Sequence, residues 1–500
     1  MKTLKKLLCV VLVTVMLSAV TVPASAKIDN SVVCPQIYVP GVASTAVYAD
    51  ENNPDSALGI PDKDSLTAIL ASELLPAFIA YAADKDSAKL GYSISSVLNK
   101  LFEDWFNNPD GTAKGNAGAG FIYPDKKNIS TSSTLRFSYD WRGDPIEIAA
   151  ELADYVDYVI EATGCEKVAL TSHSFGAVVI LTYLTIYGSD KVMGIVLDTP
   201  AINGLTSVGE LFSGKTVFCE AGIEALFKMI MGSTEYAELS DSIVDILTMA
   251  GINGSVSDFL NDAYDEIGDI LMEETLFPFF GSWLSIWSMI PDEYIDDVMT
   301  YSFDSGVYDE DYSALKAKVQ AYNDTVRKYK KQTLESFDKE GRVAVISRYG
   351  YSAVPMTEQW NMLSDSVIET ANSSLGATTA ALGQIFSEEY LAGKDMKYIS
   401  PDKTVDASTC LFPEKTWFIK DLSHEVTSAT IPLHKELLFT AEESTCENSD
   451  ISRFMAYNRA DGSLGTDESE PALAEKLTVL DRIFNFIKAL INKLLDIFGI

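Results

Sequence analysis

Histidine is scarce in this sequence: the 500 residues contain three, His173, His424 and His434. Cysteine is also rare, with six residues and no C-x-x-C pair. So few imidazole and thiol groups argue against a zinc site, and we expect neither a metal nor a cofactor. A reaction that needs an imidazole base must use one of the three histidines.

Basic residues are few relative to acidic ones. Lys and Arg total 38 against 72 Asp and Glu, which gives a formal charge of −34. A surface this acidic disfavours nucleic acid, because phosphate backbones are bound through clustered Lys and Arg. We therefore expect no nucleic-acid partner.

The apolar run at residues 7–20 is too short to span a membrane comfortably. Lys2, Lys5 and Lys6 precede it, and Ala24-Ser25-Ala26 follows it. This arrangement is typical of a signal peptide, so we assign residues 1–26 to one and expect a secreted protein. Five cysteines follow, an odd number that leaves at least one unpaired; a bridge between Cys410 and Cys446 is conceivable in an oxidising compartment.

The most informative stretch is residues 166–184, EKVALTSHSFGAVVILTYL. It predicts a short buried strand, a tight turn carrying Ser174, and an apolar helix, which is the nucleophile elbow of an α/β-hydrolase. Gly176 gives the turn the small residue that it needs, whereas Ser172 stands where Gly is usual. The amide of Phe175 would then face a developing oxyanion.

Strands and helices alternate around this elbow. Residues 33–39 and 135–138 are strand-like, Asp144-Pro145 begins a helix that ends at Gly164, and residues 194–197 form the next strand. The alternation predicts an α/β-hydrolase fold, with a mostly parallel central sheet and helices on both faces. Pro40-Gly41 follows the first strand, so the amide of Val42 is the candidate second oxyanion donor, although an ordinary Pro-Gly turn would look the same.

Residues 204–340 interrupt the alternation with helical, acidic sequence. We interpret them as a cap inserted between two parts of the core, residues 27–203 and 341–465. The aromatic run LFPFFGSWLSIWSMI at 276–290 could line an acyl pocket or form the core of the cap itself.

The second part of the core offers the partners for Ser174, because the chain order of this fold is Ser, then acid, then His. His424 follows the predicted strand 416–420 and is the favoured base. His434 lies in a predicted helix, and the ring of His173 would point away from the nucleophile. For the acid we favour Asp402, followed by Asp406 and Asp198.

Six short segments together resemble the lecithin:cholesterol acyltransferase family of α/β-hydrolases. They are YVPGVAST at 38–45, FSYDWRGDP at 137–145, SHSFG at 172–176, DTPAING at 198–204, SRYG at 347–350 and DKTV at 402–405. The resemblance implies that Asp402 is the catalytic acid and that Val42 is an oxyanion donor. It does not reach most of the cap or the C-terminus, and Ser172, Ala177 and Lys403 depart from the family pattern.

We therefore expect a secreted serine hydrolase that cleaves acyl esters, including lipids. An O-acyltransferase with the same acyl-enzyme is one alternative, and a non-catalytic surface-binding protein on a hydrolase scaffold is another. Residues 466–500 form an acidic linker and a predicted amphipathic helix at 477–498 with a wide apolar face. That helix could lie in a membrane interface, bind a cell-surface partner, or fold back onto the core.

Overall fold

A computed structural model describes residues 29, 32–59, 72, 76–77, 86–219, 252–304, 312–354, 357 and 359–471. The predicted signal peptide and the predicted helix at 477–498 lie outside these residues. Within them, no helix is long and apolar enough to cross a membrane.

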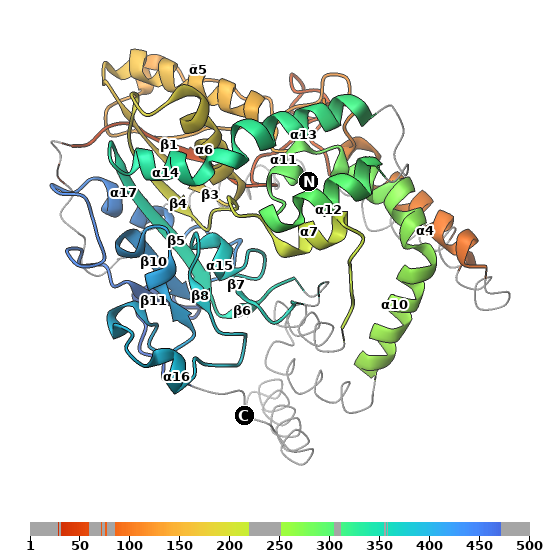
Figure 1. Ribbon diagram of the computed structural model, residues 1–500. Coiled ribbons are helices and arrows are strands. Elements are labelled where there is room, and N and C mark those ends of the chain that lie inside the picture. Colours follow the sequence, from red (N-terminus) through yellow and green to blue (C-terminus); the bar gives the residue numbers. More distant parts are fainter. Residues whose placement is uncertain are drawn as a thin grey trace, which may run out of the picture.

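The core is an eight-stranded sheet in the order β12-β11-β10-β5-β4-β3-β1-β2 (Figure 1). Its strands are β1 (Gln36–Val39), β2 (Thr134–Arg136), β3 (Val168–His173), β4 (Val192–Asp198), β5 (Arg342–Tyr349), β10 (Thr416–Lys420), β11 (Phe454–Asn458) and β12 (Ser463–Thr466). All neighbours pair in parallel except β11 and β12. The predicted α/β fold with a mostly parallel sheet is confirmed.

Alternating residues of the central strands enter two different hydrophobic cores. Leu170, Ile195 and Val345 belong to one cluster, together with residues of α5 (Pro145–Thr163), α6 (Phe175–Tyr187) and α14 (Lys330–Phe337). Ala169, Val196 and Ile346 belong to the other, which includes α17 (Ile431–Leu438). Because side chains of a strand alternate between faces, the sheet is covered by helices on both sides, and its central strands are buried on both faces.

The predicted boundaries of α5 have clear physical causes. The Asp144 carboxylate accepts a hydrogen bond from the Ile146 N–H at 2.9 Å, and Pro145 occupies the first helical position. Gly164 ends the helix with a φ of 71°, in the left-handed region that glycine adopts most easily.

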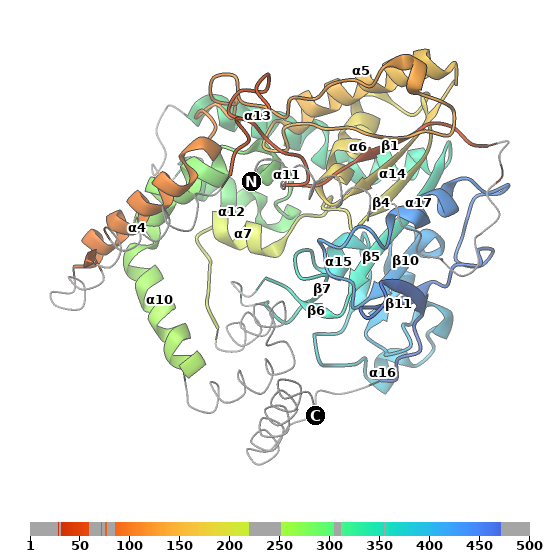
Figure 2. The same cartoon turned by 180° about the vertical axis from the view of Figure 1, so that it is seen from behind.

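Between β4 and β5, the described regular elements are all helical. They are α7 (Thr206–Phe212), α10 (Ile252–Leu271), π-helical Met272–Gly281, α11 (Leu284–Ser288), the 3-10 helix Asp292–Tyr294, α12 (Ile295–Met299), π-helical Thr300–Asp304, α13 (Ser313–Thr325), the 3-10 helix Arg327–Tyr329 and α14. The helix α4 (Ser87–Phe102) packs along α10. Both project beyond the sheet (Figures 1 and 2).

The chain between β5 and β10 forms shorter elements near one end of the sheet. These are the hairpin β6 (Tyr351–Ser352) and β7 (Leu363–Ser364), the pair β8 (Thr378–Thr379) and β9 (Val405–Asp406), and the helices α15 (Thr370–Ser373) and α16 (Glu388–Leu391). Ile399 makes an isolated bridge with Asp406.

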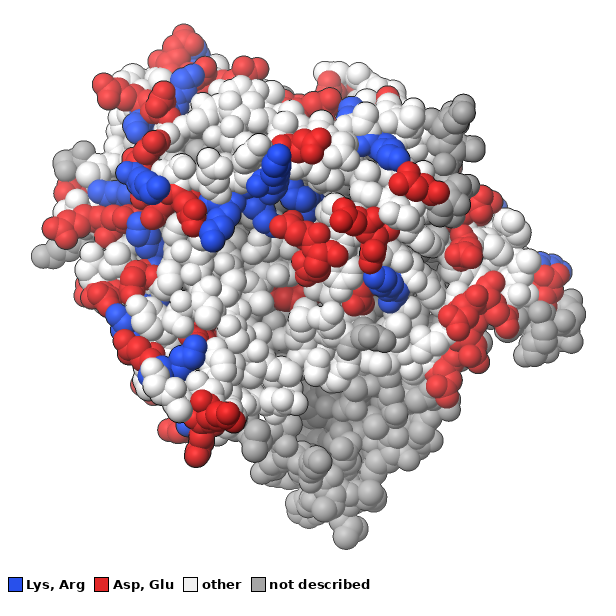
Figure 3. Space-filling model, in the orientation of Figure 1, with Lys and Arg blue, Asp and Glu red and all other residues white. Residues whose placement is uncertain are grey.

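Charged groups are spread over the surface. On the face shown in Figure 3, Lys and Arg side chains lie among Asp and Glu over much of the area.

Candidate active site

Ser174 occupies a strained turn between β3 and α6. Its φ of 55° and ψ of −124° are unfavourable for a residue with a side chain. The turn is tight because the backbone of β1 passes close behind it: a Cβ on Gly176 would lie 2.1 Å from the Val39 carbonyl oxygen. Only glycine fits there. The geometry is that of the predicted nucleophile elbow.

Ser172 occupies the position where glycine is usual, and its hydroxyl forms a hydrogen bond with the neighbouring strand β4. Its Oγ donates to the Val196 carbonyl, 3.1 Å away on β4. The side chain is thus fully buried without an unpaired polar atom in this position.

The loop after β1 lies directly against the nucleophile. A Cβ on Gly41 would be 2.8 Å from Cβ of Ser174, so the backbone before Val42 comes as close as atoms allow. Phe175 is the first residue of α6, and its N–H therefore has no carbonyl partner within the helix. Val42 follows Gly41 on this loop and Phe175 follows Ser174 on the elbow, so the two candidate oxyanion donors belong to the two segments that meet at the serine.

Residues of the FSYDWRGDP segment hold this loop in place. The Tyr139 hydroxyl donates to the Pro40 carbonyl, and Trp141 Nε1 donates to the Thr45 carbonyl at 3.0 Å. Trp141 also packs edge-on against Trp283 of the cap, with ring centroids 5.1 Å apart. The segment thus fixes both ends of the loop and connects it to the cap.

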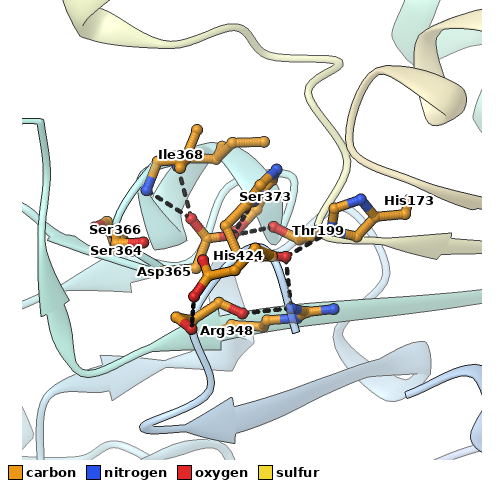
Figure 4. Close-up of polar contacts among 12 residues, drawn as sticks. His173, Thr199, Arg348, Ser364, Asp365, Ser366, Ile368, Ser373 and His424 are labelled. Carbon is orange, nitrogen blue, oxygen red and sulfur yellow. Dashed lines mark hydrogen bonds and ion pairs between the residues drawn. The ribbon is translucent and has the colours of Figure 1, made fainter. Parts of the chain in front are cut away.

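His424 follows β10 and pairs with Asp365, which follows β5 and β7 (Figure 4). Its Nδ1 lies 2.7 Å from Asp365 Oδ2. The other carboxylate oxygen accepts from the amides of Val367 and Ile368, and the Thr199 hydroxyl donates to Oδ2 at 2.5 Å. Burial alone would raise the pKa of Asp365, but His424 and these hydrogen bonds lower it to about 2.

The expectation that Asp402 orients His424 is therefore corrected. Asp402 pairs with Lys420 at 2.7 Å and accepts from the hydroxyls of Ser400 and Thr404. Burial opposes its charge, but these partners lower its pKa overall. Lys420 is the last residue of β10, so Asp402 lies beside the strand that leads to His424 but binds that strand instead of the histidine.

The other two candidate acids also have different partners. Asp406 accepts from Lys394, Tyr390 and Ser408. Asp198, at the end of β4, accepts two bonds of 3.0 Å from Arg348 and one from Thr430. Burial opposes the charge of Asp198, yet Arg348 holds its pKa well below the usual range.

His434 is completely buried in α17, 3.6 Å from Asp198 Oδ2. Its ring lies near Asp198, whereas the ring of His424 lies at Asp365. His173, by contrast, contributes more than the sequence indicates: its ring lies against that of His424, with centroids 4.6 Å apart.

The aromatic run of the cap is divided between two environments. Phe277, Leu284, Trp287 and Ile290 form a core within the cap, whereas Phe279, Trp283 and Met289 join the main hydrophobic core. The first group agrees with the expectation of a core within the cap, whereas the second group attaches the cap to the main core, which neither interpretation included.

The described residues contain no group of three or more His, Cys, Asp or Glu side chains arranged to hold a metal ion. The side chains at the elbow suit a different chemistry. His424 binds Asp365 through Nδ1, which leaves Nε2 to accept a proton. His173, the residue before Ser174, packs its ring against that of His424.

The chain matches no protein-family model and no curated protein. One solved structure that matches is described as the crystal structure of the Tle4–Tli4 complex, with 11% identity, 63% of this chain and 75% of that chain covered, and a TM-score of 0.25. A TM-score this low does not establish a shared fold, so the fold assignment rests on the sheet and the elbow described above.

Proposed function

We propose that this protein is a serine hydrolase of carboxylic esters. The observation that carries the proposal is the combination of a strained Ser174 on the elbow after β3 with an Asp365–His424 pair on the loops after β5 and β10. The three residues follow in the chain order Ser, Asp, His that belongs to this fold.

In the proposed reaction, Ser174 Oγ attacks the ester carbonyl while His424 Nε2 takes its proton. The amides of Val42 and Phe175 donate to the oxyanion of the tetrahedral intermediate. His424 then returns the proton to the departing alcohol, and an acyl-Ser174 ester remains. Water, activated by the same histidine, completes the hydrolysis and regenerates the serine.

Asp365 has two tasks in this scheme. Its carboxylate fixes His424 in the tautomer that carries the proton on Nδ1, and it stabilises the imidazolium that forms during attack. The hydrogen bonds from Thr199, Val367 and Ile368 keep the carboxylate charged and hold it in one orientation.

The finer part of the proposal is that the acyl group belongs to a lipid. The resemblance of six segments to the lecithin:cholesterol acyltransferase family supports it. The same acyl-enzyme could pass its acyl group to an alcohol instead of water.

Hydrolysis of p-nitrophenyl esters tests both parts. The wild-type protein should hydrolyse p-nitrophenyl butyrate, and Ser174→Ala should reduce the rate by a factor on the order of 10⁵ or more. A preference for p-nitrophenyl laurate over butyrate supports a lipid substrate, whereas a preference for acetate contradicts it. Product analysis with added alcohol separates transfer from hydrolysis. Equal rates for wild type and Ser174→Ala would rule out the proposed chemistry.

A further inference from the structure

Two donors converge on the backbone carbonyl of His424. His173 Nε2 lies 2.9 Å from this oxygen, and Arg348 Nη1 lies 3.0 Å from it (Figure 4). A carbonyl oxygen has two lone pairs, so these two donors satisfy it completely. On its other side, the His424 N–H donates to the Asp365 carbonyl at 2.9 Å. The backbone of the base is thus fixed at both of its polar groups.

The protonation of His173 follows from this contact. A carbonyl can only accept, so Nε2 of His173 must carry the proton and Nδ1 must be bare. The ring is nearly inaccessible, with 4% of the residue exposed. Burial, together with the nearby His424, lowers the pKa of His173 to about 3, and the ring remains neutral at ordinary pH. His173 therefore acts as a fixed hydrogen-bond donor and does not titrate with the base.

The position of the His173 ring connects three parts of the site. His173 immediately precedes Ser174 in the chain. Its Nδ1 would be 3.3 Å from a Cβ on Gly41, which places the loop before Val42 against one edge of the ring. Its face packs against His424. The ring therefore lies between the candidate oxyanion loop and the loop that carries the candidate base.

We propose that His173 is a positioning residue, which holds the backbone of His424 so that the imidazole stays aligned with Ser174. The inference rests on the proposed function, because it concerns the alignment of that nucleophile and base. It assigns no proton transfer to His173. A misalignment of about 1 Å between reacting groups can slow a reaction by a factor on the order of 10².

Arg348 also holds the backbone of His424, but this role cannot be tested separately from its role in stability. It is fully buried, donates to the carbonyls of Ser423, His424 and Val426, and forms the ion pair with Asp198. Removing one partner of a buried ion pair leaves an unpaired charge and destabilises the fold strongly. His173 can be replaced without that penalty, and it is therefore the residue on which the idea is tested.

The test compares two substitutions of similar size. His173→Gln keeps a side-chain N–H at nearly the distance of Nε2, whereas His173→Phe keeps the ring packing and loses the donor. For ester hydrolysis, His173→Phe should lower kcat by a factor of about 10 to 100 and change KM by less than about twofold. His173→Gln should keep kcat within about threefold of wild type. The rate of labelling by a fluorophosphonate probe should follow the same order.

Melting temperatures check that the variants are folded. If His173→Phe does not fold, His173→Met replaces it, because Met fills irregular space without supplying a donor. The positioning role is wrong if folded His173→Phe or His173→Met reacts as fast as wild type, or if His173→Gln is slowed as much as they are. If wild-type protein reacts with neither ester nor probe, the proposed function itself has failed, which is a separate result.

Discussion

Asp365 contacts His424 through both its side chain and its backbone. Its Oδ2 lies 2.7 Å from Nδ1 of the imidazole, and its carbonyl accepts the His424 N–H at 2.9 Å. The two residues are 59 positions apart in the chain, so the tertiary structure alone brings them together. A histidine held at its ring and its main chain by one residue has little freedom to change orientation. This arrangement is what the proposed role of His424 as a base requires.

The first prediction separates the two candidate acids. Asp365→Asn should reduce kcat/KM for ester hydrolysis by a factor on the order of 10³ to 10⁴, because an amide can neither hold the required tautomer nor stabilise the imidazolium. Asp402→Asn should change kcat/KM by less than about fivefold, since Asp402 binds Lys420 and neighbouring hydroxyls. Steady-state kinetics of both variants decide the matter. The opposite ranking would return the role of the acid to Asp402.

The second prediction distinguishes the histidines. His424→Ala should lower kcat by a factor on the order of 10³ or more and leave the melting temperature within a few degrees of wild type. His434→Ala should lower the melting temperature and leave kcat nearly unchanged, because His434 is fully buried in α17 and its truncation leaves a cavity. Activity and thermal melts measured on the same preparations test both statements. A fully active, unstable His424→Ala would assign the two histidines the other way round.

The sequence predicted Ser174 at a position where the structure forms a strained turn between a strand and a helix, and His424 on the loop after β10. Each of these follows from local signals: a strand, a turn with small residues, and a helix start. Asp365 has no such signal. It lies in the segment Ser364-Asp365-Ser366-Val367-Ile368, whose carboxylate closes its own turn onto the amides of Val367 and Ile368.

The choice of Asp402 shows why the acid was missed. The chain contains 72 acidic residues, and both Asp365 and Asp402 lie between Ser174 and His424. The chain order Ser, Asp, His is therefore compatible with either aspartate, and the DKTV motif favoured Asp402. Asp365 belongs to the connection that follows β5, the strand adjacent to β4, and parallel strands gather their following loops at one sheet edge. The hairpin of β6 and β7 separates Asp365 from the end of β5 in the sequence, so its place at this sheet edge is not evident from the sequence alone.

The third prediction concerns the tight packing of the elbow. Gly176→Ala should destabilise the protein by about 3 kcal/mol or more, because the added Cβ would lie 2.1 Å from the Val39 carbonyl oxygen and backbone cannot easily move. Gly465→Ala on β12 is the matched control, since nothing lies within 4 Å of its Cβ. Urea unfolding should find the control within about 0.5 kcal/mol of wild type. Similar midpoints for both variants would contradict the described elbow.

The fourth prediction follows from the buried carboxyl of Glu369, which is 2% exposed and accepts from the Thr206 amide and Asn372. Burial raises its pKa from 4.5 to about 7. The folded state therefore binds this proton more tightly than the unfolded state, and the free energy of unfolding falls as pH rises from about 4.5 to 7.

Glu369→Gln removes this titration and keeps an acceptor for Thr206. The variant and wild type should be about equally stable near pH 4.5, and the variant should be more stable above pH 7 by on the order of 2–3 kcal/mol. Urea unfolding at several pH values measures the difference. A difference that does not change with pH would show that Glu369 titrates alike in both states.

The most direct measurement of the central claim is the reaction of the intact protein with a fluorophosphonate probe, followed by mass spectrometry of its peptides. The probe reacts with a serine only where a neighbouring base activates it. The account predicts one modified peptide, carrying the phosphonyl group on Ser174, in wild-type protein. It predicts no modified peptide in Ser174→Ala, and labelling slowed by a factor on the order of 10³ in His424→Ala. Modification of a different serine, or equal labelling of wild type and Ser174→Ala, would contradict it.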